Sequence, residues 1–138
     1  METHTKPRIL IVEDHPLIAE LVETRLRIEG MVPTKCAGGR EALAALSAEQ
    51  FDAVILDIMM PDVDGYEVLR AIRSTEVTAG LPVIFLTAKS APADIERGLA
   101  LGANHYITKP FSGQDLMRKL RLCLAERKLA PAESPAAG

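Results

Sequence analysis

The sequence predicts a single α/β domain, in which helices cover both faces of a parallel sheet. Five short apolar or β-branched runs alternate with five amphipathic stretches along the chain. Three of these runs are continuously aliphatic or aromatic, as is typical of strands that are buried on both faces: Ile9–Val12, Val54–Leu56 and Val83–Leu86. Repeated strand-then-helix order indicates parallel strands joined by right-handed crossovers.

The other two runs have the character of edge strands. Val32–Cys36 contains Pro33, which lacks the N–H group that a central strand needs for its ladder. His105–Thr108 is short and mixed in polarity, which suits the opposite edge of the sheet. The sequence therefore places its three most apolar strands in the middle of the sheet.

Five stretches carry apolar residues at helical spacing. Gly30 and Gly102 follow the first and fourth stretches as stop signals, and Ser112 with Asp115 has the spacing of a capping box before the fifth. The apolar positions are Leu17, Ile18, Leu21, Val22 and Leu26; Ala42, Leu43 and Leu46; Val68, Leu69 and Ile72; Ile95 and Leu99; and Leu116, Leu120, Cys123 and Leu124.

Length and composition narrow the class of protein. The chain has 138 residues, of which 48% are hydrophobic and 25% charged, which is enough for one globular core. A net charge of −3 gives no overall attraction to nucleic acid or anionic membranes. No apolar run resembles a signal peptide or a membrane span, so we expect a cytoplasmic protein. Cys36 and Cys123 match no metal or redox spacing and are interpreted as apolar core residues.

The ends of the chain differ in composition from its middle. We expect a flexible N-terminus over residues 1–6 and one domain over residues 7–128. Residues 129–138 are rich in Ala and Pro, which is typical of a tail or a linker.

Polar residues gather where the predicted strands end. Glu13 and Asp14 follow the first strand, Asp57 follows the third, Thr87 follows the fourth, and Lys109 follows the fifth. In an open α/β sheet, ligands bind outside the carboxyl ends of the strands. An Asp at the end of a single strand is usually a turn residue, but polar or charged residues at the ends of four strands together predict a site.

The composition of this cluster predicts its chemistry. Three carboxylates repel one another, so they either retain a proton or hold a cation. Oxygen ligands without Cys or His favour a hard ion such as Mg²⁺, which also accepts phosphate oxygens. Lys109 and Thr87 could then bind phosphate oxygens, and a carboxylate can be the nucleophile that forms an acyl phosphate. Asp57 is the best candidate because it ends the central apolar strand.

Together these pieces resemble the receiver domains of response regulators, and they are similar to the stand-alone receivers of chemotaxis. The resemblance covers roughly residues 7–128. It implies a flavodoxin-like (βα)5 fold, which is a doubly wound parallel sheet with strand order 2-1-3-4-5. A chemotaxis member of this family has that order. The matching pieces are Glu13-Asp14; Asp57 before Met59-Met60-Pro61-Asp62 and Asp64-Gly65; Thr87-Ala88; and Lys109-Pro110-Phe111.

The resemblance also implies roles for individual residues. Asp57 would accept a phosphoryl group from the phosphohistidine of a histidine kinase or a phosphotransfer protein, and Thr87 and Lys109 would hold it. Mg²⁺ would be bound by Glu13, Asp14, Asp57 and the backbone carbonyl of Met59, some of them through water. Thr87 and Tyr106 would form a switch, and the Lys109–Pro110 peptide bond would be cis. The protein would catalyse only its own phosphorylation and dephosphorylation.

The resemblance further implies a switched output surface, formed by the fourth helix, the fifth strand and the fifth helix. This surface would bind a downstream protein or a second copy of the chain. Basic residues crowd the last helix, either as a solvated face that suits the helix dipole or as an edge for docking. These residues are Arg118, Lys119, Arg121, Arg127 and Lys128. Without a helix-turn-helix or interleaved aromatic and basic residues, direct binding of nucleic acid is not expected.

Three alternative interpretations compete with this one. Asp62-Val63-Asp64-Gly65 resembles part of a calcium loop, but Met60 and Ala71 stand where oxygen ligands are needed. The same residues are similar to the nucleophile motif of haloacid-dehalogenase-type phosphatases, but that motif follows a strand directly. A helix N-cap at Asp64 and a close backbone approach at Gly65 explain them better. The third alternative, which stays open, is the receiver portion of a longer regulator with a DNA-binding or enzymatic output domain.

Overall fold

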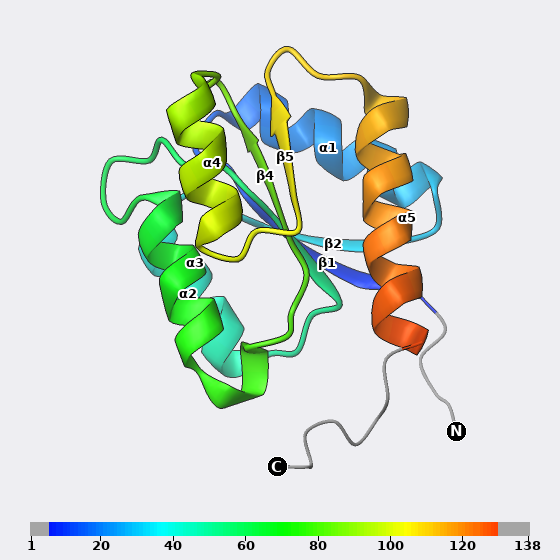
Figure 1. Cartoon of the computed structure of the whole chain (residues 1–138). Coiled ribbons are helices and arrows are strands. Elements are labelled where there is room, and N and C mark those ends of the chain that lie inside the picture. The colour runs from blue at the N-terminus through cyan, green and yellow to red at the C-terminus, as the bar shows by residue number, and fades with distance from the viewer. Residues whose placement is uncertain (1–5, 130–138) are drawn as a thin grey trace.

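The computed structural model describes residues 6–129 and shows a five-stranded parallel sheet in the order β2-β1-β3-β4-β5 (Figure 1). The strands are β1 (Arg8–Val12), β2 (Val32–Cys36), β3 (Ala53–Leu56), β4 (Val83–Thr87) and β5 (His105–Thr108). The helices are α1 (Pro16–Ile28), α2 (Gly39–Ala48), α3 (Gly65–Ser74), α4 (Pro92–Ala100) and α5 (Gly113–Leu129), with a 3-10 turn, η1, at Glu76–Thr78.

The predicted fold class and strand order are confirmed. β2 pairs along one side with β1, which places Pro33 at the sheet edge as its missing N–H group requires. β5 pairs with β4 at the opposite edge. The turn η1 between α3 and β4 was not predicted, because three residues are too short for a periodic pattern.

The core has two layers, one on each face of the sheet. Neighbouring strand residues point to opposite faces, so Ile9 and Ile11 of β1 pack toward α1 and α5, while Leu10 and Val12 pack toward α2 and α3. α1 and α5 lie on one face of the sheet and α2, α3 and α4 on the other (Figure 1). Burial on both faces explains why the central strands are continuously apolar.

The helix stop signals are confirmed, but not every periodic residue is buried. Gly30 and Gly102 end their helices with φ of +85° and +111°, a region that L side chains rarely adopt. In α1, Val22 and Leu26 enter the core, whereas Leu17 and Leu21 are 68% and 61% exposed. α1 therefore has an apolar stripe that does not face the sheet.

The basic residues of α5 do not share one surface. Arg118 and Lys119 pair with Asp115 at 2.6 Å and 3.0 Å. Arg121 instead pairs with Glu29, the residue that ends α1. Arg127 donates to the carbonyl oxygens of Phe51 and Asp52 at 3.3 Å and 3.1 Å. The side chain of Lys128 lies outside the described part of the chain.

Some expectations concern features away from the strand ends. Cys36 and Cys123 are buried and unpaired, and burial raises the pKa of each thiol to about 11, as suits apolar core residues. Ser112 accepts a hydrogen bond from the Asp115 N–H at 3.2 Å, which confirms the Ser112 half of the predicted capping box of α5. Within residues 6–129, no helix is long and apolar enough to cross a membrane. The predicted flexible start and the Ala/Pro-rich tail fall mainly on residues 1–5 and 130–138, outside the described residues.

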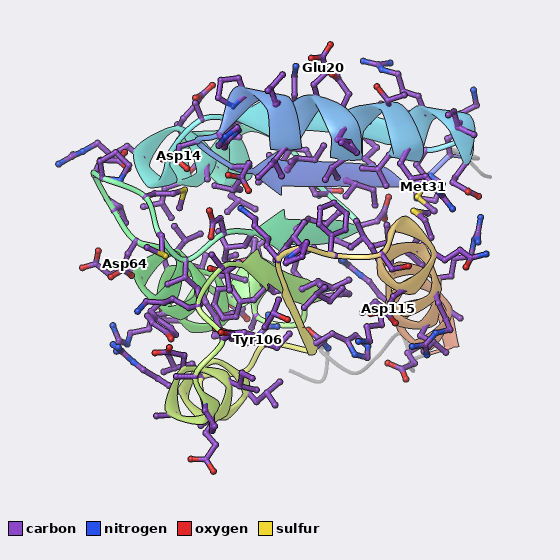
Figure 2. All side chains as sticks on the ribbon, turned by 90° about the horizontal axis from the view of Figure 1, so that it is seen from above. Asp14, Glu20, Met31, Asp64, Tyr106 and Asp115 are labelled. Atoms are coloured by element: carbon purple, nitrogen blue, oxygen red, sulfur yellow. The ribbon has the colours of Figure 1, made fainter. Side chains whose placement is uncertain are left out.

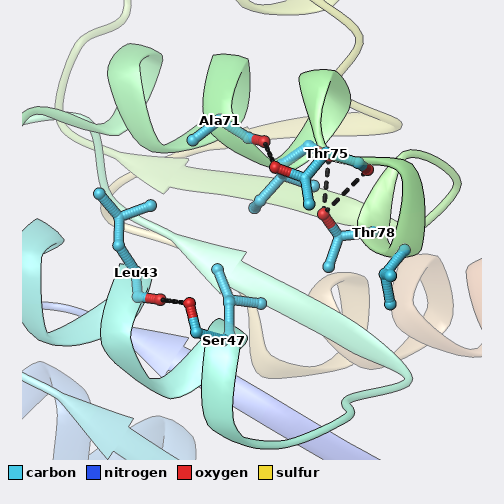
Figure 3. A pocket seen from close by; sticks show the side chains of 8 residues that line it. Leu43, Ser47, Ala71, Thr75 and Thr78 are labelled. Carbon is cyan, nitrogen blue, oxygen red and sulfur yellow. Dashed lines mark hydrogen bonds between the residues drawn. The ribbon is translucent and has the colours of Figure 1, made fainter.

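A cavity of about 340 Å³ lies between α2, α3 and η1 (Figure 3). Its hydroxyl groups donate to carbonyl oxygens of nearby residues, as Ser47 does to Leu43 at 3.2 Å and Thr75 does to Ala71 at 2.8 Å. The remaining lining is largely apolar, and it holds none of the residues that follow the strands. This cavity is therefore separate from the predicted site.

Candidate functional site

The structure brings the predicted carboxylates together. Glu13 and Asp14 follow β1 and Asp57 follows β3, and one oxygen from each lies within 4.8 Å of the others. Glu13 and Asp57 are each 5% exposed, whereas Asp14 is open to solvent. Asp14 and Asp64 lie at the end of the sheet toward which the strand arrows point, opposite Met31 (Figure 2). The cluster suits a metal site because its oxygen ligands are those that hard cations prefer.

Lys109 enters this cluster from the end of β5. Its Nζ donates to Glu13 Oε1 at 2.7 Å and to Asp57 Oδ2 at 3.3 Å, and its side chain is 15% exposed. Burial raises the pKa of Glu13, although the hydrogen bond from Lys109 opposes that effect. One ammonium group offsets only part of the repulsion among three ionised carboxylates, so the cluster can accept a further cation.

The loop between β3 and α3 folds back so that its last residues pack against the backbone of Asp57. Asp57 Oδ1 accepts from the Met59 N–H at 3.3 Å, and the Gly65 N–H donates to the Ile58 carbonyl at 2.9 Å. A Cβ atom on Gly65 would lie 2.3 Å from the carbonyl oxygen of Asp57, so only glycine fits there. The predicted tight approach at Gly65 is confirmed.

Asp64 begins α3 with a complete capping box, as the N-cap prediction expected. Its carboxylate accepts from the Glu67 N–H at 2.9 Å, and Glu67 Oε1 accepts from the Asp64 N–H at 3.3 Å. This box fixes the end of the loop that begins at Asp57.

Thr87 and Tyr106 lie on neighbouring strands, with Lys89 between them in space. Thr87 is fully buried as the last residue of β4, and its hydroxyl accepts from the Lys89 N–H at 3.4 Å. The Tyr106 hydroxyl donates to the Lys89 carbonyl at 2.7 Å. Its ring packs edge-to-face on Phe85 with centroids 5.7 Å apart, and burial raises the pKa of Tyr106. The Lys109–Pro110 bond is cis, as the family resemblance implies.

A groove of about 530 Å³ opens beside the acidic cluster. Asp14 and the 53% exposed side chain of Met59 line one part of it, and Lys89 and Arg97 line another. The Arg97 guanidinium carbon lies 3.9 Å from the centre of the Tyr66 ring. The groove gives an incoming group access to the carboxylates from solvent.

Two contributions to the site were not recognised in the sequence. Tyr66 links α3 to α4 by donating to the Asp94 carbonyl at 3.3 Å. Asp62, to which no role was assigned from the sequence, caps the first turn of α2. The start of that helix at Gly38-Gly39, with no capping side chain of its own, is a signal that could have suggested an external cap.

Comparisons with known proteins agree with this geometry. A family model described as the response regulator receiver domain matches residues 9–121. The probable transcriptional regulatory protein TcrX of Mycobacterium tuberculosis is 41% identical over 93% of the chain and 54% of its own length. The DNA-binding response regulator MtrA of Mycolicibacterium smegmatis is 37% identical over 93% of the chain and 55% of its own length. The chain thus spans about half the length of the curated relatives it matches.

Solved structures of similar fold include receivers of two kinds. The chemotaxis response regulator CheY4 of Vibrio cholerae is 32% identical with a TM-score of 0.82, covering 87% of this chain and all of its own. The receiver domain of the sensor histidine kinase PA1611 from Pseudomonas aeruginosa has a magnesium ion in its active site cleft. It is 35% identical with a TM-score of 0.81, covering 88% of this chain and 99% of its own. The chain belongs to the response regulator receiver family and is a receiver domain of two-component signalling.

Proposed function

We propose that Asp57 is the phosphoacceptor, and that its donor is a phosphohistidine of a histidine kinase or a phosphotransfer protein. The observation that carries this proposal is the contact of the buried Asp57 carboxylate with Lys109, beside two further carboxylates. An Asp57 oxygen attacks phosphorus while the phosphorus–nitrogen bond breaks, and the bonding electrons return to the imidazole. The product is an acyl phosphate on Asp57.

The surrounding residues have distinct roles in this proposal. Glu13, Asp14, Asp57 and the Met59 carbonyl hold Mg²⁺, some of them through water, and Thr87 and Lys109 bind the phosphoryl oxygens. The bound ion offsets the negative charge of those oxygens. Lys109 already contacts two carboxylates, so it can exchange one of them for a phosphoryl oxygen with little movement. The protein acts on no external substrate, and it works in the cytoplasm.

The outer face of α1 suits a protein phosphodonor. Leu17, Leu21 and Ile28 are 68%, 61% and 74% exposed, and a groove of about 560 Å³ runs along them. α1 starts two residues after Asp14, so a protein on this face would stand beside the acidic cluster. Exposed apolar residues that form one stripe favour a binding surface over scattered surface positions.

The output surface in this proposal is formed by α4, β5 and α5. A phosphoryl oxygen draws the Thr87 hydroxyl inward, which favours the buried position of Tyr106 and one of two packings of α4. This surface then binds a downstream protein or a second copy of the chain. Arg118 and Lys119 lie near β5, where burial lowers the pKa of His105 and the charges of Lys119 and Arg118 lower it further, and they would favour an acidic partner. The absence of direct nucleic-acid binding stays a prediction.

The phosphoacceptor is tested with Asp57→Asn, an almost isosteric change. Intact mass spectrometry after incubation with acetyl phosphate and Mg²⁺ should show the mass of one added phosphoryl group on the wild type and none on the variant. EDTA should abolish the gain. The matched control is Asp115→Asn on α5, outside the cluster, which should be phosphorylated like the wild type. An equal gain in Asp57→Asn would refute the assignment.

A second candidate function is that of the receiver portion of a longer regulator. It is favoured by the length of the matched relatives, which are named as transcriptional regulators and extend well beyond the matched region. Sequencing the native gene past the codon for Gly138 tests it. An open frame that encodes a DNA-binding or enzymatic domain would support this candidate, and a stop codon would exclude it.

A further inference from the structure

The first turn of α2 is capped by a residue that is distant in sequence. The N-cap position is Gly38, which has no side-chain acceptor for the free N–H groups of the first turn. Asp62 provides the acceptors, because its Oδ1 accepts from the Gly39 N–H at 3.2 Å and its Oδ2 from the Arg40 N–H at 3.0 Å. Hydrogen bonds from backbone N–H groups, first that of Arg40, hold the pKa of Asp62 below its usual range.

Close packing reinforces this cap. A Cβ atom on Gly39 would lie 2.3 Å from the carbonyl oxygen of Val63 and 2.7 Å from its Cβ. A Cβ atom on Gly38 would lie 3.1 Å from both carboxylate oxygens of Asp62. Because the two glycines have no Cβ atom, the chain at Asp62 and Val63 can pack directly against the start of α2.

The capping residue belongs to the loop that carries the site. This loop begins at Asp57, where the Met59 N–H contacts the carboxylate, and ends at the capping box of Asp64. Asp62 lies between these fixed points, three residues after Met59. The hydrogen bonds from α2 to Asp62 therefore fix the loop three residues after Met59, and the position of the Met59 carbonyl depends on that part of the loop.

We propose that Asp62 is a positioning residue for the metal site, acting through α2 rather than by touching the ion. The inference rests on the proposed function, in which the Met59 carbonyl is a Mg²⁺ ligand. Without the Asp62 acceptors, the loop samples other positions and the ion loses a ligand for part of the time. Changes to groups that orient metal ligands typically weaken affinity by about tenfold or more, and we expect an effect on the order of tenfold for Asp62→Ala.

The chain offers a matched control at the same helix end. Glu41 also serves the start of α2, where its Oε1 accepts from the Ala37 N–H at 2.9 Å, but none of its described contacts is with the loop from Asp57 to Asp64. Glu41→Ala removes one negative charge and one hydrogen bond from this helix end. A second comparison is Asp62→Asn, which loses the charge and keeps one of the two acceptor oxygens.

The experiment is a Mg²⁺ titration of the full chain followed by amide resonances, which needs no phosphorylation. Asp62→Ala should raise the midpoint about tenfold. Glu41→Ala should leave the midpoint near that of the wild type. Asp62→Asn keeps one acceptor where the carboxylate offers two, so its midpoint should lie between those of the wild type and Asp62→Ala. Hydrogen exchange at Gly39 and Arg40 should accelerate in Asp62→Ala, and thermal unfolding checks that each variant is folded.

The outcomes separate the two proposals. If the wild type shows no Mg²⁺-dependent shifts at Asp14 and Asp57, the proposed function fails and this inference fails with it. If the wild type binds Mg²⁺ but Asp62→Ala binds equally well, only the positioning role is wrong. An equal rise of the midpoint in Glu41→Ala would attribute the effect to charge and likewise reject the role.

Discussion

The helices α3 and α4 start at the carboxyl ends of neighbouring strands and flank the same site, but the protein holds them very differently. Five of the ten residues of α3 are buried, namely Gly65, Tyr66, Val68, Leu69 and Ile72, and a complete capping box begins the helix. In α4, all nine residues of which are described, Gly98 alone is buried. Its N-cap, Ala91, has no side-chain acceptor. One wall of the site is therefore fixed by burial, and the other is held weakly.

Two tyrosines make contacts that hold α4. Tyr66 donates to the Asp94 carbonyl and stacks under Arg97, while a Cβ atom on Gly98 would lie 3.0 Å from the rings of Phe85 and Tyr106. A helix held by few contacts can occupy two positions of similar free energy, whereas a helix with a large buried face cannot. The comparison teaches that α3 is the firmly packed wall of the site and α4 the weakly packed one, which is the difference that the proposed response of α4 to Asp57 requires.

The largest expected effect is a difference in stability between matched leucine truncations. Leu69→Ala on α3 removes a fully buried side chain and should lower the free energy of unfolding by about 2–5 kcal/mol. Leu99→Ala on α4 removes a side chain that is 46% exposed and should change it by no more than about 0.5 kcal/mol. Urea unfolding followed by circular dichroism measures both. Equal losses would contradict the contrast between the two helices.

An intermediate effect concerns the response to a phosphoryl analogue. Beryllofluoride, which would stand in for the phosphoryl group on Asp57 under the proposed function, should slow amide hydrogen exchange in α4 several-fold and leave α3 nearly unchanged, because α3 is already packed. Thr87→Ala lacks the hydroxyl that would couple the phosphoryl group to Tyr106. In that variant the change should stay within the site. Slower exchange of α4 without the Thr87 hydroxyl would refute this coupling route, and equal changes in both helices would remove the distinction between them.

The smallest expected effect concerns the helix caps. Asp64→Ala removes the capping box of α3 and should cost about 1 kcal/mol, whereas Ala91→Ser adds an acceptor to α4 and should gain a few tenths of a kcal/mol. Thermal unfolding of both variants at the same pH and ionic strength measures the difference. A destabilising Ala91→Ser would show that the start of α4 is not limited by its missing cap.

Much of the fold and the site could be predicted from the sequence, because both depend on local patterns. Continuous apolar runs identify central strands, and Pro33 and the mixed polarity of His105–Thr108 identify the edges. Parallel strands carry their carboxyl ends to one side of a sheet, so residues that follow different strands must meet there. The approach of Glu13, Asp14, Asp57 and Lys109 follows from that geometry. The particular strand order came from the family resemblance.

Other features were decided only in the tertiary structure. Helical periodicity cannot tell which of two apolar stripes faces the sheet, so Leu17 and Leu21 resembled core residues although the packing of α1 leaves them exposed. The bonds from Gly39 and Arg40 to Asp62 join elements that are 22 or 23 residues apart, and no local pattern encodes such a pairing. The sequence by itself determined where strands end and which chemistry gathers there. Only folding decided which helix is held firmly, because that depends on how much of each helix the sheet and its neighbours cover.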